Sequence, residues 1–325
     1  MIIKYYYSNS TNPYANLAIE EVLFDSKKND EIIIYLWQND RTVVIGRYQN
    51  IFEEVNLDYA SSHGIKVVRR LTGGGAVYHD LGNLNYSFIV DEHNDSIDYC
   101  RSILEKVLLK YDIVLEKQGR NDLIVNGAKV SGTAKHIEKG KILYHGTLLI
   151  KSDLSVLQKV LTRNNKISNS VSKKSVERRV ANLSDIIGQN MSVEDIISDF
   201  SQELNMQPIH LYEDNDKIVE LVNKRYGTTM WNYGFQGSYD YSNKRRFNGG
   251  TVAVYVNIKM GIIEDIHFSG DFISEQDVSE LEKKIKGLKL DTEMRNALKT
   301  ICADKYIKGV TCEDMYSLFE EVCMK

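Results

Sequence analysis

The sequence predicts an α+β protein with a large N-terminal domain and a small C-terminal one. The first half combines a few helical patterns with many short β-rich runs, and it lacks the regular βαβ rhythm of a doubly wound sheet. The last third begins with a hairpin pattern and continues with three helical patterns. We expect domains at residues 1–243 and 244–325, divided in the polar stretch Asp240–Arg246.

Composition excludes several classes of protein. The 325 residues are 42% hydrophobic and 26% charged, as in ordinary globular proteins. A net charge of −4 gives no positive field for nucleic acid, and no apolar run approaches the roughly 18 residues that span a bilayer. The N-terminus is too polar for a signal peptide, and the four cysteines form no CxxC pair. We therefore expect a cytoplasmic protein without nucleic-acid or membrane partners.

Local patterns predict the elements that precede the glycines. Residues 2–8 suit an edge strand, and Asn12-Pro13 suits the start of a helix, because Asn caps well and Pro fits the first turn. The runs Ile32–Trp37 and Thr42–Ile45 indicate a hairpin around Asn39-Asp40. A short helix at Glu53–Ser62 then leads to a strand at 65–68.

Local patterns in the rest of the chain predict further strands and helices. The strands expected here are Tyr86–Val90, Leu123–Val125, Lys129–Ala134, Ile142–Ile150, Thr251–Ile258 and Gly261–Phe268. The helices expected here are Ile97–Tyr111, Leu154–Leu161, Val193–Leu204, Asp216–Tyr226 and three near 275–286, 291–305 and 311–323. Asn126-Gly127 and Met260-Gly261 suit tight hairpin turns.

Three consecutive glycines, Gly73, Gly74 and Gly75, separate two expected strands. Glycine allows unusual dihedral angles and removes Cβ, so a ligand can approach bare backbone amides. Arg70 before the glycines and His79 after them add charge or hydrogen bonds, which predicts an anion site. The P-loop and Rossmann alternatives are disfavoured because those glycines precede a helix. A glycine-rich turn without chemistry is the remaining alternative.

A second candidate element is the string Asn121-Asp122 followed by Lys129-Val130-Ser131-Gly132. Lys129 follows the Asn126-Gly127 turn and has small neighbours, so a ligand can reach it. The string is not K-x-D-G, which disfavours covalent capture of a nucleotide by the lysine. A solvated surface lysine is the alternative interpretation.

These motifs, in their order and spacing, resemble the lipoate–protein ligase family over nearly the whole chain. The segments that carry the resemblance are Asn12–Glu21, Thr42–Asn50, Arg69–Asp80, Gly82-Asn83, Asn121-Asp122, Lys129–Ala134, His145–Leu149, Ser170-Val171, Arg178–Leu183 and Gly270–Phe272. The resemblance implies a mixed sheet flanked by helices, like that of class II aminoacyl-tRNA synthetases and biotin protein ligases. It also implies a small α+β C-terminal domain.

The resemblance implies a reaction and its participants. Lipoate and ATP give lipoyl-AMP, and the lipoyl group then passes to a lysine of an acceptor, either a 2-oxoacid dehydrogenase E2 subunit or the glycine cleavage H protein. Lys129 is the implied catalytic group. Mg²⁺ is expected with ATP, and Asp122 is a candidate metal contact. The basic segment 163–180 is expected to be a mobile loop that closes over the adenylate.

The resemblance also assigns the binding residues. The implied ATP contacts are Arg70, Gly75, Ala76, Val77, Tyr78 and Lys129. The implied lipoate contacts are Gly73, Gly74, His79, Lys129 and His145. Leu17, Trp37 and Val44 either line the apolar part of the lipoate site or belong to the core.

Three rival functions remain. An octanoyl or lipoyl transferase without ATP needs a cysteine thiolate, and only Cys100 lies outside the small domain. A biotin ligase has a different glycine loop. A non-catalytic binder of lipoyl domains needs neither the glycines nor Lys129.

Overall fold

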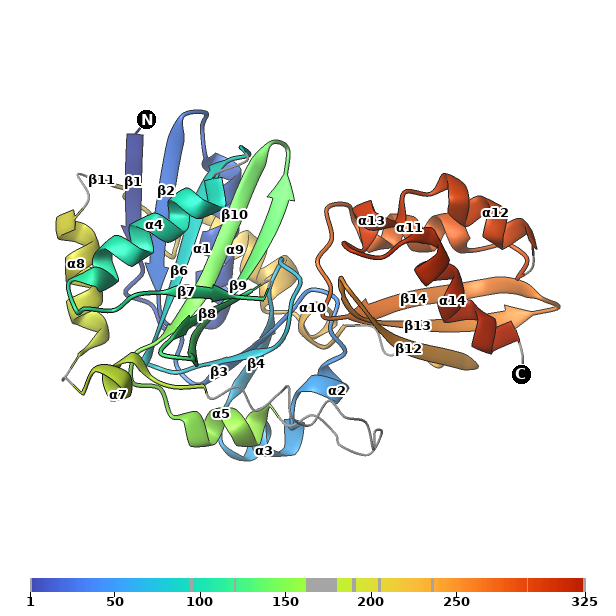
Figure 1. The fold of residues 1–325 in the computed structure, drawn as a ribbon, viewed down its shortest axis with the longest axis horizontal. Helices are drawn as coiled ribbons and strands as arrows, with labels where there is room; N and C mark the ends of the chain where they lie inside the picture. Colours follow the sequence, from blue (N-terminus) through green and yellow to red (C-terminus); the bar gives the residue numbers. More distant parts are fainter. Residues whose placement is uncertain are drawn as a thin grey trace. The chain divides into compact units, whose positions relative to one another are not determined.

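The computed structural model describes residues 2–93, 96–119, 121–161, 180–188, 191–203, 206–234, 237–290 and 292–323 (Figure 1). The chain forms two compact units. Unit 1 comprises the residues up to Val44, Phe52–Arg69 and Ala76–Asn232, and unit 2 comprises Ile45–Ile51, Arg70–Gly75 and the residues from Tyr233 onward. The division expected at 243/244 falls inside strand β12 (Tyr241–Phe247). Two loops from the N-terminal half also group with the C-terminal residues, which no contiguous division anticipates.

An eight-stranded mixed sheet forms the centre of unit 1, in the order β11-β1-β2-β6-β10-β9-β8-β7. Its strands are β1 (Ile2–Tyr7), β2 (Glu31–Trp37), β6 (Asn83–Asp91), β7 (Glu116–Gln118), β8 (Asp122–Val125), β9 (Ala128–Glu138), β10 (Lys141–Leu149) and β11 (Gln207–Pro208). Strand β1 is parallel to β2 and β11, and the other pairings of this sheet are antiparallel. The predicted α+β class with a mixed sheet is confirmed. The edge position expected for residues 2–8 is wrong, because β11 pairs with the outer side of β1.

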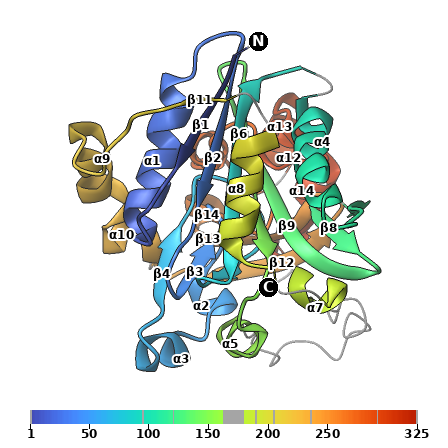
Figure 2. The ribbon, with the colours of Figure 1, turned by 90° about the vertical axis from the view of Figure 1, so that its left-hand side faces the viewer.

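Helices cover both faces of this sheet (Figure 2). On one face lie α1 (Pro13–Ser26) and α9 (Asp216–Leu221), and on the other α4 (Ser96–Leu109) and α8 (Val193–Glu203). The main core fills the α4 side with large side chains, among them Ile34, Tyr86, Phe88, Leu104 and Phe200. Strand β2 is buried along its whole length, as expected for a strand covered on both faces. The remaining helices of unit 1 include α3 (Leu57–Ser62), α5 (Leu154–Val160), α7 (Leu183–Ile187), the π-helix η1 (Val222–Tyr226) and α10 (Thr229–Tyr233).

A separate three-stranded sheet has the order β4-β3-β5, with β3 (Thr42–Ile45), β4 (Lys66–Arg69) and β5 (Val77–His79). The predicted hairpin between β2 and β3 is therefore wrong. The Asn39 side chain accepts a hydrogen bond from Asn16, and the Asp40 amide donates to the Thr11 carbonyl. These contacts tie the connection to the start of α1, so that β3 joins the other sheet.

Local capping and turn chemistry is confirmed elsewhere. The Asn12 side chain caps α1 by accepting from the Tyr14 amide at 3.1 Å. The β8–β9 turn has positive φ at Asn126 (50°) and Gly127 (77°), as a type I′ hairpin turn requires. The helix expected at 53–62 is instead two short helices, α2 (Ile51–Glu54) and α3, because Asn56 starts a new helix as its N-cap.

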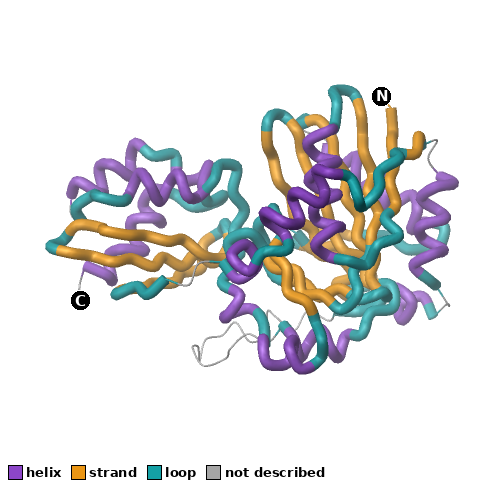
Figure 3. The backbone as a smooth tube through the Cα atoms, turned by 180° about the vertical axis from the view of Figure 1, so that it is seen from behind, coloured by secondary structure: helices purple, strands orange, loops and turns teal. Residues whose placement is uncertain are grey.

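Unit 2 contains an antiparallel sheet in the order β12-β13-β14, on which helices pack around one core (Figure 3). Its elements are β12, β13 (Gly250–Lys259), β14 (Ile262–Gly270), α11 (Val278–Ile285), α12 (Thr292–Thr300), α13 (Ala303–Tyr306) and α14 (Cys312–Cys323). The β13–β14 hairpin is confirmed, with its turn at Met260-Gly261. Strand β12 was not predicted, since its polar run Ser242–Arg246 is typical of a linker.

None of the helices in the described ranges has both the length and the hydropathy required to cross a membrane.

Candidate active site

Lys129 stands near the start of β9, directly after the β8–β9 turn. Its Nζ lies 2.8 Å from Oδ1 of Asp122, which faces it from β8. The side chains are 30% and 18% exposed, respectively, so the pair is sheltered but accessible. Gly132 is the register partner of Asp122, and a Cβ built on it would lie 3.5 Å from the Lys129 ammonium. The hairpin thus brings together the two halves of the predicted motif.

The backbone of Lys129 is held by the segment that follows the basic region. Its carbonyl accepts from the Ala181 amide at 3.0 Å, and Lys129 forms a parallel β-bridge with Val180. The segment expected to close over the site, 163–180, lies outside the described residues except for Val180. Ser170, Val171, Arg178 and Arg179 of the predicted motif fall there as well.

His145 is buried on β10 against a buried carboxylate. Its Nδ1 lies 2.9 Å from Oε1 of Glu20 on α1, and the Ser87 hydroxyl donates to the same oxygen. The Trp37 indole N–H in turn donates to Ser87 Oγ at 3.1 Å. A carboxylate beside Nδ1 favours the tautomer that carries its proton there, which directs the other ring nitrogen to accept.

His79 is buried at the end of β5 and belongs to a second polar chain. Its Nδ1 lies 3.2 Å from Asn39 Nδ2, while Asn39 Oδ1 accepts from Asn16 Nδ2 at 3.0 Å. Since that Asn39 nitrogen is a donor, His79 Nδ1 accepts and its ring proton sits on Nε2. The imidazole meets the Trp37 ring edge-on at 5.9 Å between centroids. Trp37 therefore links the two predicted histidines. Like Leu17 and Val44, it is buried.

Strand β6 adds buried polar groups to the face of the sheet that carries His145. Asn83 Nδ2 donates to Asn85 Oδ1 at 2.9 Å. Within the described part of the chain, Asn83 Oδ1 and Asn85 Nδ2 are buried and have no hydrogen-bond partner. An unsatisfied buried polar atom costs about 1–3 kcal/mol, so this face is suited to a ligand or to water.

The sequence reasoning gave no role to Glu20, Ser87 or Asn85. The signal for Asn85 and Ser87 is a period-2 alternation of polar and apolar residues in Asn83-Leu84-Asn85-Tyr86-Ser87-Phe88, whereas Glu20 lies in helix α1 and shares no such pattern. A strand between two helix layers is expected to be apolar on both faces, so polar residues at every second position mark a functional face.

In unit 2, Arg70 organises the backbone of the glycine loop. Its Nη2 donates to the carbonyl oxygens of Gly73 at 2.6 Å and Gly75 at 2.9 Å, and its Nε donates to Thr72 Oγ1 at 2.8 Å. The residue is 5% exposed. The structure therefore gives Arg70 a scaffolding task in the loop in addition to the ligand contact that was expected of it.

The backbone requires glycine at two of these three positions, each for a different reason. A Cβ on Gly73 would lie 2.1 Å from the Phe272 carbonyl oxygen, so close backbone approach requires glycine there. Gly74 has φ of 90°, in the left-handed region. Gly75 has neither a positive φ nor any atom within 4 Å of a built Cβ. Only Gly75 borders open space.

The residues after the glycines belong to unit 1. Val77 and Tyr78 pair with Val44 and Val43 on β3. The Tyr78 side chain is buried, and burial together with Asp80 raises the pKa of Tyr78 to about 12. Among Ala76, Val77 and Tyr78, the first two are partly exposed and can present their surfaces to a ligand.

Metal binding and thiol chemistry have little support in the residues that the structure describes. In those ranges no three His, Cys, Asp or Glu side chains come together as a metal site requires. Asp122 can supply one carboxylate oxygen, so a Mg²⁺ ion there would take its other ligands from phosphates and water. Cys100 is buried on α4, and burial raises the pKa of its thiol to about 12, which opposes a thiolate nucleophile.

The chain matches two protein-family models. Residues 12–205 match the lipoyl protein ligase A/B catalytic domain, and residues 236–319 match the bacterial lipoate protein ligase C-terminus. The chain is 34% identical to lipoate-protein ligase LplJ of Bacillus subtilis over 323 residues, which cover 95% of this chain and 97% of the relative. It is 36% identical to lipoate–protein ligase 1 of Staphylococcus aureus over 294 residues, covering 88% and 90%.

Solved structures of lipoate ligases are also similar to this chain. LipL1 of P. falciparum, in complex with lipoate, has a TM-score of 0.79 at 28% identity and covers 92% of this chain and 94% of its own. A lipoate-protein ligase A bound with ATP has a TM-score of 0.59 at 28% identity, covering 72% and 98%. A bipartite lipoate protein ligase from Thermoplasma acidophilum, described with its E2 lipoyl domain, has a TM-score of 0.61 at 29% identity, covering 74% and 98%.

Proposed function

This chain belongs to the lipoate–protein ligase family, and from that premise we propose that it activates lipoate with ATP and transfers the lipoyl group to a lysine of an acceptor protein. In the first step a lipoate carboxylate oxygen attacks the α-phosphorus of ATP, and pyrophosphate leaves. In the second step a deprotonated acceptor amine attacks the lipoyl carbonyl carbon, and AMP leaves. The enzyme is thus a carboxylate-adenylating ligase.

The position of Lys129 is the observation that carries the proposal. The first step joins two anions, and two unit charges 4 Å apart repel by about 4 kcal/mol at an effective dielectric of 20. A cation between them offsets this repulsion and stabilises the charge that develops on the phosphate. Lys129 suits the task, because it is a compact charge that is partly exposed and fixed by Asp122 and by its backbone bridge.

The other assignments rest on the family and on chemistry. We propose Gly73, Gly74, His79, His145 and Lys129 as lipoate contacts. Hydrogen bonds fix the orientations of the buried His79 and His145 rings, which supports the assignment of these two residues. For ATP we propose Arg70, Gly75, Ala76, Val77, Tyr78 and Lys129. Gly75 has the strongest physical support of the glycines for a ligand contact, because nothing occupies the space beside it.

The proposal also includes a metal ion and the kind of acceptor protein. Mg²⁺ bound to ATP would shield the phosphates, with Asp122 as the protein residue that can hold it. We propose an E2 subunit or an H protein as the acceptor, and a ligase relative described together with its E2 lipoyl domain supports the first of these. A cytoplasmic location is also proposed, since the reaction consumes ATP.

Lys129→Ala tests the assignment. With lipoate and Mg-ATP, the parent protein should release pyrophosphate and add one lipoyl group to an acceptor domain, as seen by mass spectrometry. Loss of the cation should lower adenylation by about 10²–10³-fold, because the group acts on the developing charge. Lys139→Ala, on the exposed β9–β10 turn, is the matched control and should retain activity.

Two outcomes contradict the proposal. Lipoyl-AMP formation by Lys129→Ala at the parent rate would remove the role of the lysine. A covalent acyl-protein formed from an acyl donor without ATP would instead favour the transferase alternative, which the buried Cys100 thiol opposes.

A further inference from the structure

A small cavity of unit 1 lies on the α4 side of the large sheet, on the opposite face from His145. Tyr144 precedes His145 on β10, so the two side chains point to opposite faces. The cavity has a volume of about 120 Å³, and its lining includes Arg101 of α4, Lys117 of β7, Asp122 of β8, Thr133 and Lys135 of β9, and Tyr144. The ligation reaction proposed above uses Asp122 and gives no role to the other lining side chains named here.

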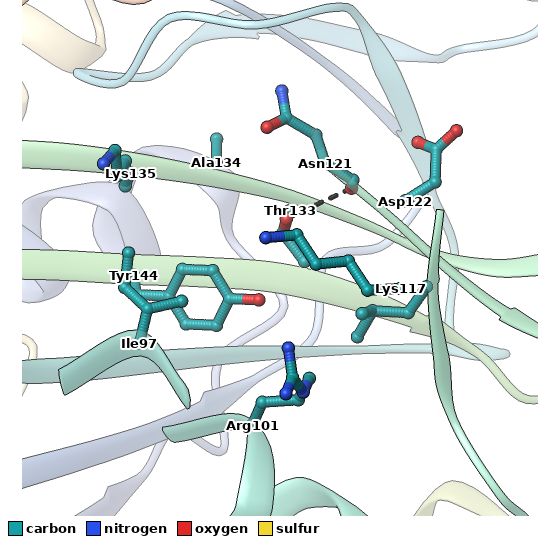
Figure 4. A pocket seen from close by; sticks show the side chains of 10 residues that line it. Ile97, Arg101, Lys117, Asn121, Asp122, Thr133, Ala134, Lys135 and Tyr144 are labelled. Carbon is teal, nitrogen blue, oxygen red and sulfur yellow. Dashed lines mark hydrogen bonds between the residues drawn. The ribbon is translucent and has the colours of Figure 1, made fainter. Parts of the chain in front are cut away.

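Three cationic side chains border this space. Figure 4 shows the Lys117 ammonium between the hydroxyl groups of Thr133 and Tyr144, with the Arg101 guanidinium directed toward the same point from α4. Arg101 is balanced by Asp98 and Glu105 on its own helix, at 3.2 and 3.1 Å. No carboxylate of the described residues forms an ion pair with Lys117 or Lys135. Asp122 is the one carboxylate among the lining residues, and Lys129 pairs with it at 2.8 Å. The lining therefore has three cations and one carboxylate, which leaves it a net positive charge.

Neutral polar groups complete the lining. Tyr144 is 7% exposed, and burial raises the pKa of its phenol, although Thr133 and Arg101 act in the opposite direction. The phenol stays protonated near neutral pH and can donate a hydrogen bond into the cavity. The Thr133 hydroxyl donates to the Asn121 carbonyl at 3.1 Å, which fixes that corner (Figure 4).

The volume limits the ligand. A water molecule takes about 30 Å³ in the liquid, so the cavity corresponds to about four waters. Sites for drug-sized molecules measure about 300–1,000 Å³, which excludes a nucleotide. One tetrahedral or planar oxyanion matches both the size and the charge.

We propose that this cavity binds one small oxyanion, of the phosphate class, between Lys117, Arg101 and the Tyr144 hydroxyl. Lys135 adds to the positive potential from the side. Binding is independent of lipoate activation, so it is expected even where adenylation is abolished.

Calorimetric titration of the full-length protein with phosphate, sulfate and acetate, at constant ionic strength and against chloride, tests the proposal. Phosphate should bind with one-to-one stoichiometry. Lys117→Ala should weaken this binding about tenfold, as expected for a lost charge-assisted hydrogen bond. Tyr144→Phe keeps the ring, removes the donor and should weaken binding severalfold.

Two further variants locate the anion. Lys139→Ala removes an exposed lysine of the β9–β10 turn and should leave the affinity unchanged. Lys129→Ala removes the lysine that pairs with Asp122 at the cavity, so it should weaken phosphate binding, but less than Lys117→Ala does. A larger loss in Lys129→Ala than in Lys117→Ala would place the anion at the adenylation site instead and would overturn the proposal. Acetate binding that responds to Lys117→Ala would support the site and extend it to carboxylates. A phosphate affinity that is unchanged in both Lys117→Ala and Tyr144→Phe, or binding of none of the three anions, would overturn the proposal.

Discussion

Gly75 differs from its two neighbours because nothing in the backbone demands a glycine at that position. Gly73 is required by the approach of the Phe272 carbonyl, and Gly74 by its left-handed dihedral angle. A residue type that the fold does not need, at the border of open space, is best explained by a ligand. The triple glycine thus separates into two structural residues and one functional candidate.

Alanine substitution distinguishes these roles. Gly73→Ala places a methyl group 2.1 Å from a backbone oxygen, so the free energy of unfolding should fall by about 1–3 kcal/mol, as in overpacked cores. Gly75→Ala should change it by less than about 0.5 kcal/mol, yet slow adenylation about tenfold, because the methyl group enters the ligand space. Denaturant unfolding and pyrophosphate release measure the two effects. Equal activity of Gly75→Ala and the parent would contradict the functional role.

At the residue scale, the sequence indicated candidate site residues but not the partners that hold them. Lys129 and His145 were predicted from motifs and resemblance, and the hairpin does place Lys129 beside Asp122. Glu20, which fixes the His145 ring, lies 125 positions away in the chain. A partner at that separation depends on how α1 packs on the sheet, and no local pattern encodes that packing.

At the scale of elements, the connection between α1 and β6 shows how a buried charge is stabilised. Lys27, just after α1, has a side chain that is 0% exposed and pairs with Asp91 at the end of β6. The Asp30 amide also donates to this carboxylate at 3.0 Å. Burial by itself raises the pKa of Asp91, but the hydrogen bonds from Lys27 and Asp30 outweigh it and lower the pKa below its usual value.

The sign of this shift predicts acid sensitivity. A carboxyl group whose pKa is lowered by folding stabilises the protein above its unfolded pKa of about 3.9, and this stability is lost as the pH falls further. Asp91→Asn should therefore cost about 1.5–3 kcal/mol at pH 7, and the difference from the parent should shrink below about pH 4. Urea unfolding at several pH values measures it, with the exposed Asp214→Asn as control. A gap between parent and Asp91→Asn that is constant with pH would refute the assignment.

The elements that sequence predicted well are those with local causes. Asn12 as an N-cap and Asn126-Gly127 as a hairpin turn depend on a few neighbouring residues, and both are present. The prediction of a β2–β3 hairpin was wrong because contacts of Asn39 and Asp40 with the region of α1 determine which sheet β3 joins. Strand β12 was missed because its polar composition, on an edge strand of its sheet, matches a linker.

At the scale of the whole molecule, unit 2 is assembled from three separate stretches of chain. The Gly74 amide donates to the Phe272 carbonyl at 3.4 Å, and the Gly270 amide donates to the Tyr48 carbonyl at 2.8 Å. The rings of Tyr48 and Phe272 stack at 4.9 Å between centroids. The glycine loop therefore takes its shape from residues some 200 positions later, which explains why a contiguous division of the sequence into domains was insufficient.

Truncation after Asn232 tests this dependence. Such a chain retains the large sheet and its core, so its far-UV circular dichroism should still report a folded protein. The glycine loop, however, loses its partner Phe272, and Tyr48 loses its partner Gly270. Misplacement of a positioning group by about 1 Å can cost about 10²-fold in rate, so pyrophosphate release should fall by at least that factor.

The same contact can be weakened without removing any part of the chain. Tyr48→Ala in the full-length protein deletes the stacking partner of Phe272 and should lower adenylation in the same direction, whereas Tyr48→Phe keeps the ring and should retain most activity. Tyr48 is not among the proposed ligand contacts, so a loss confined to Tyr48→Ala points to the shape of the loop. If the truncated chain and Tyr48→Ala both adenylated lipoate at the parent rate, the loop would hold its active shape without unit 2, and the C-terminal residues would have to serve another purpose.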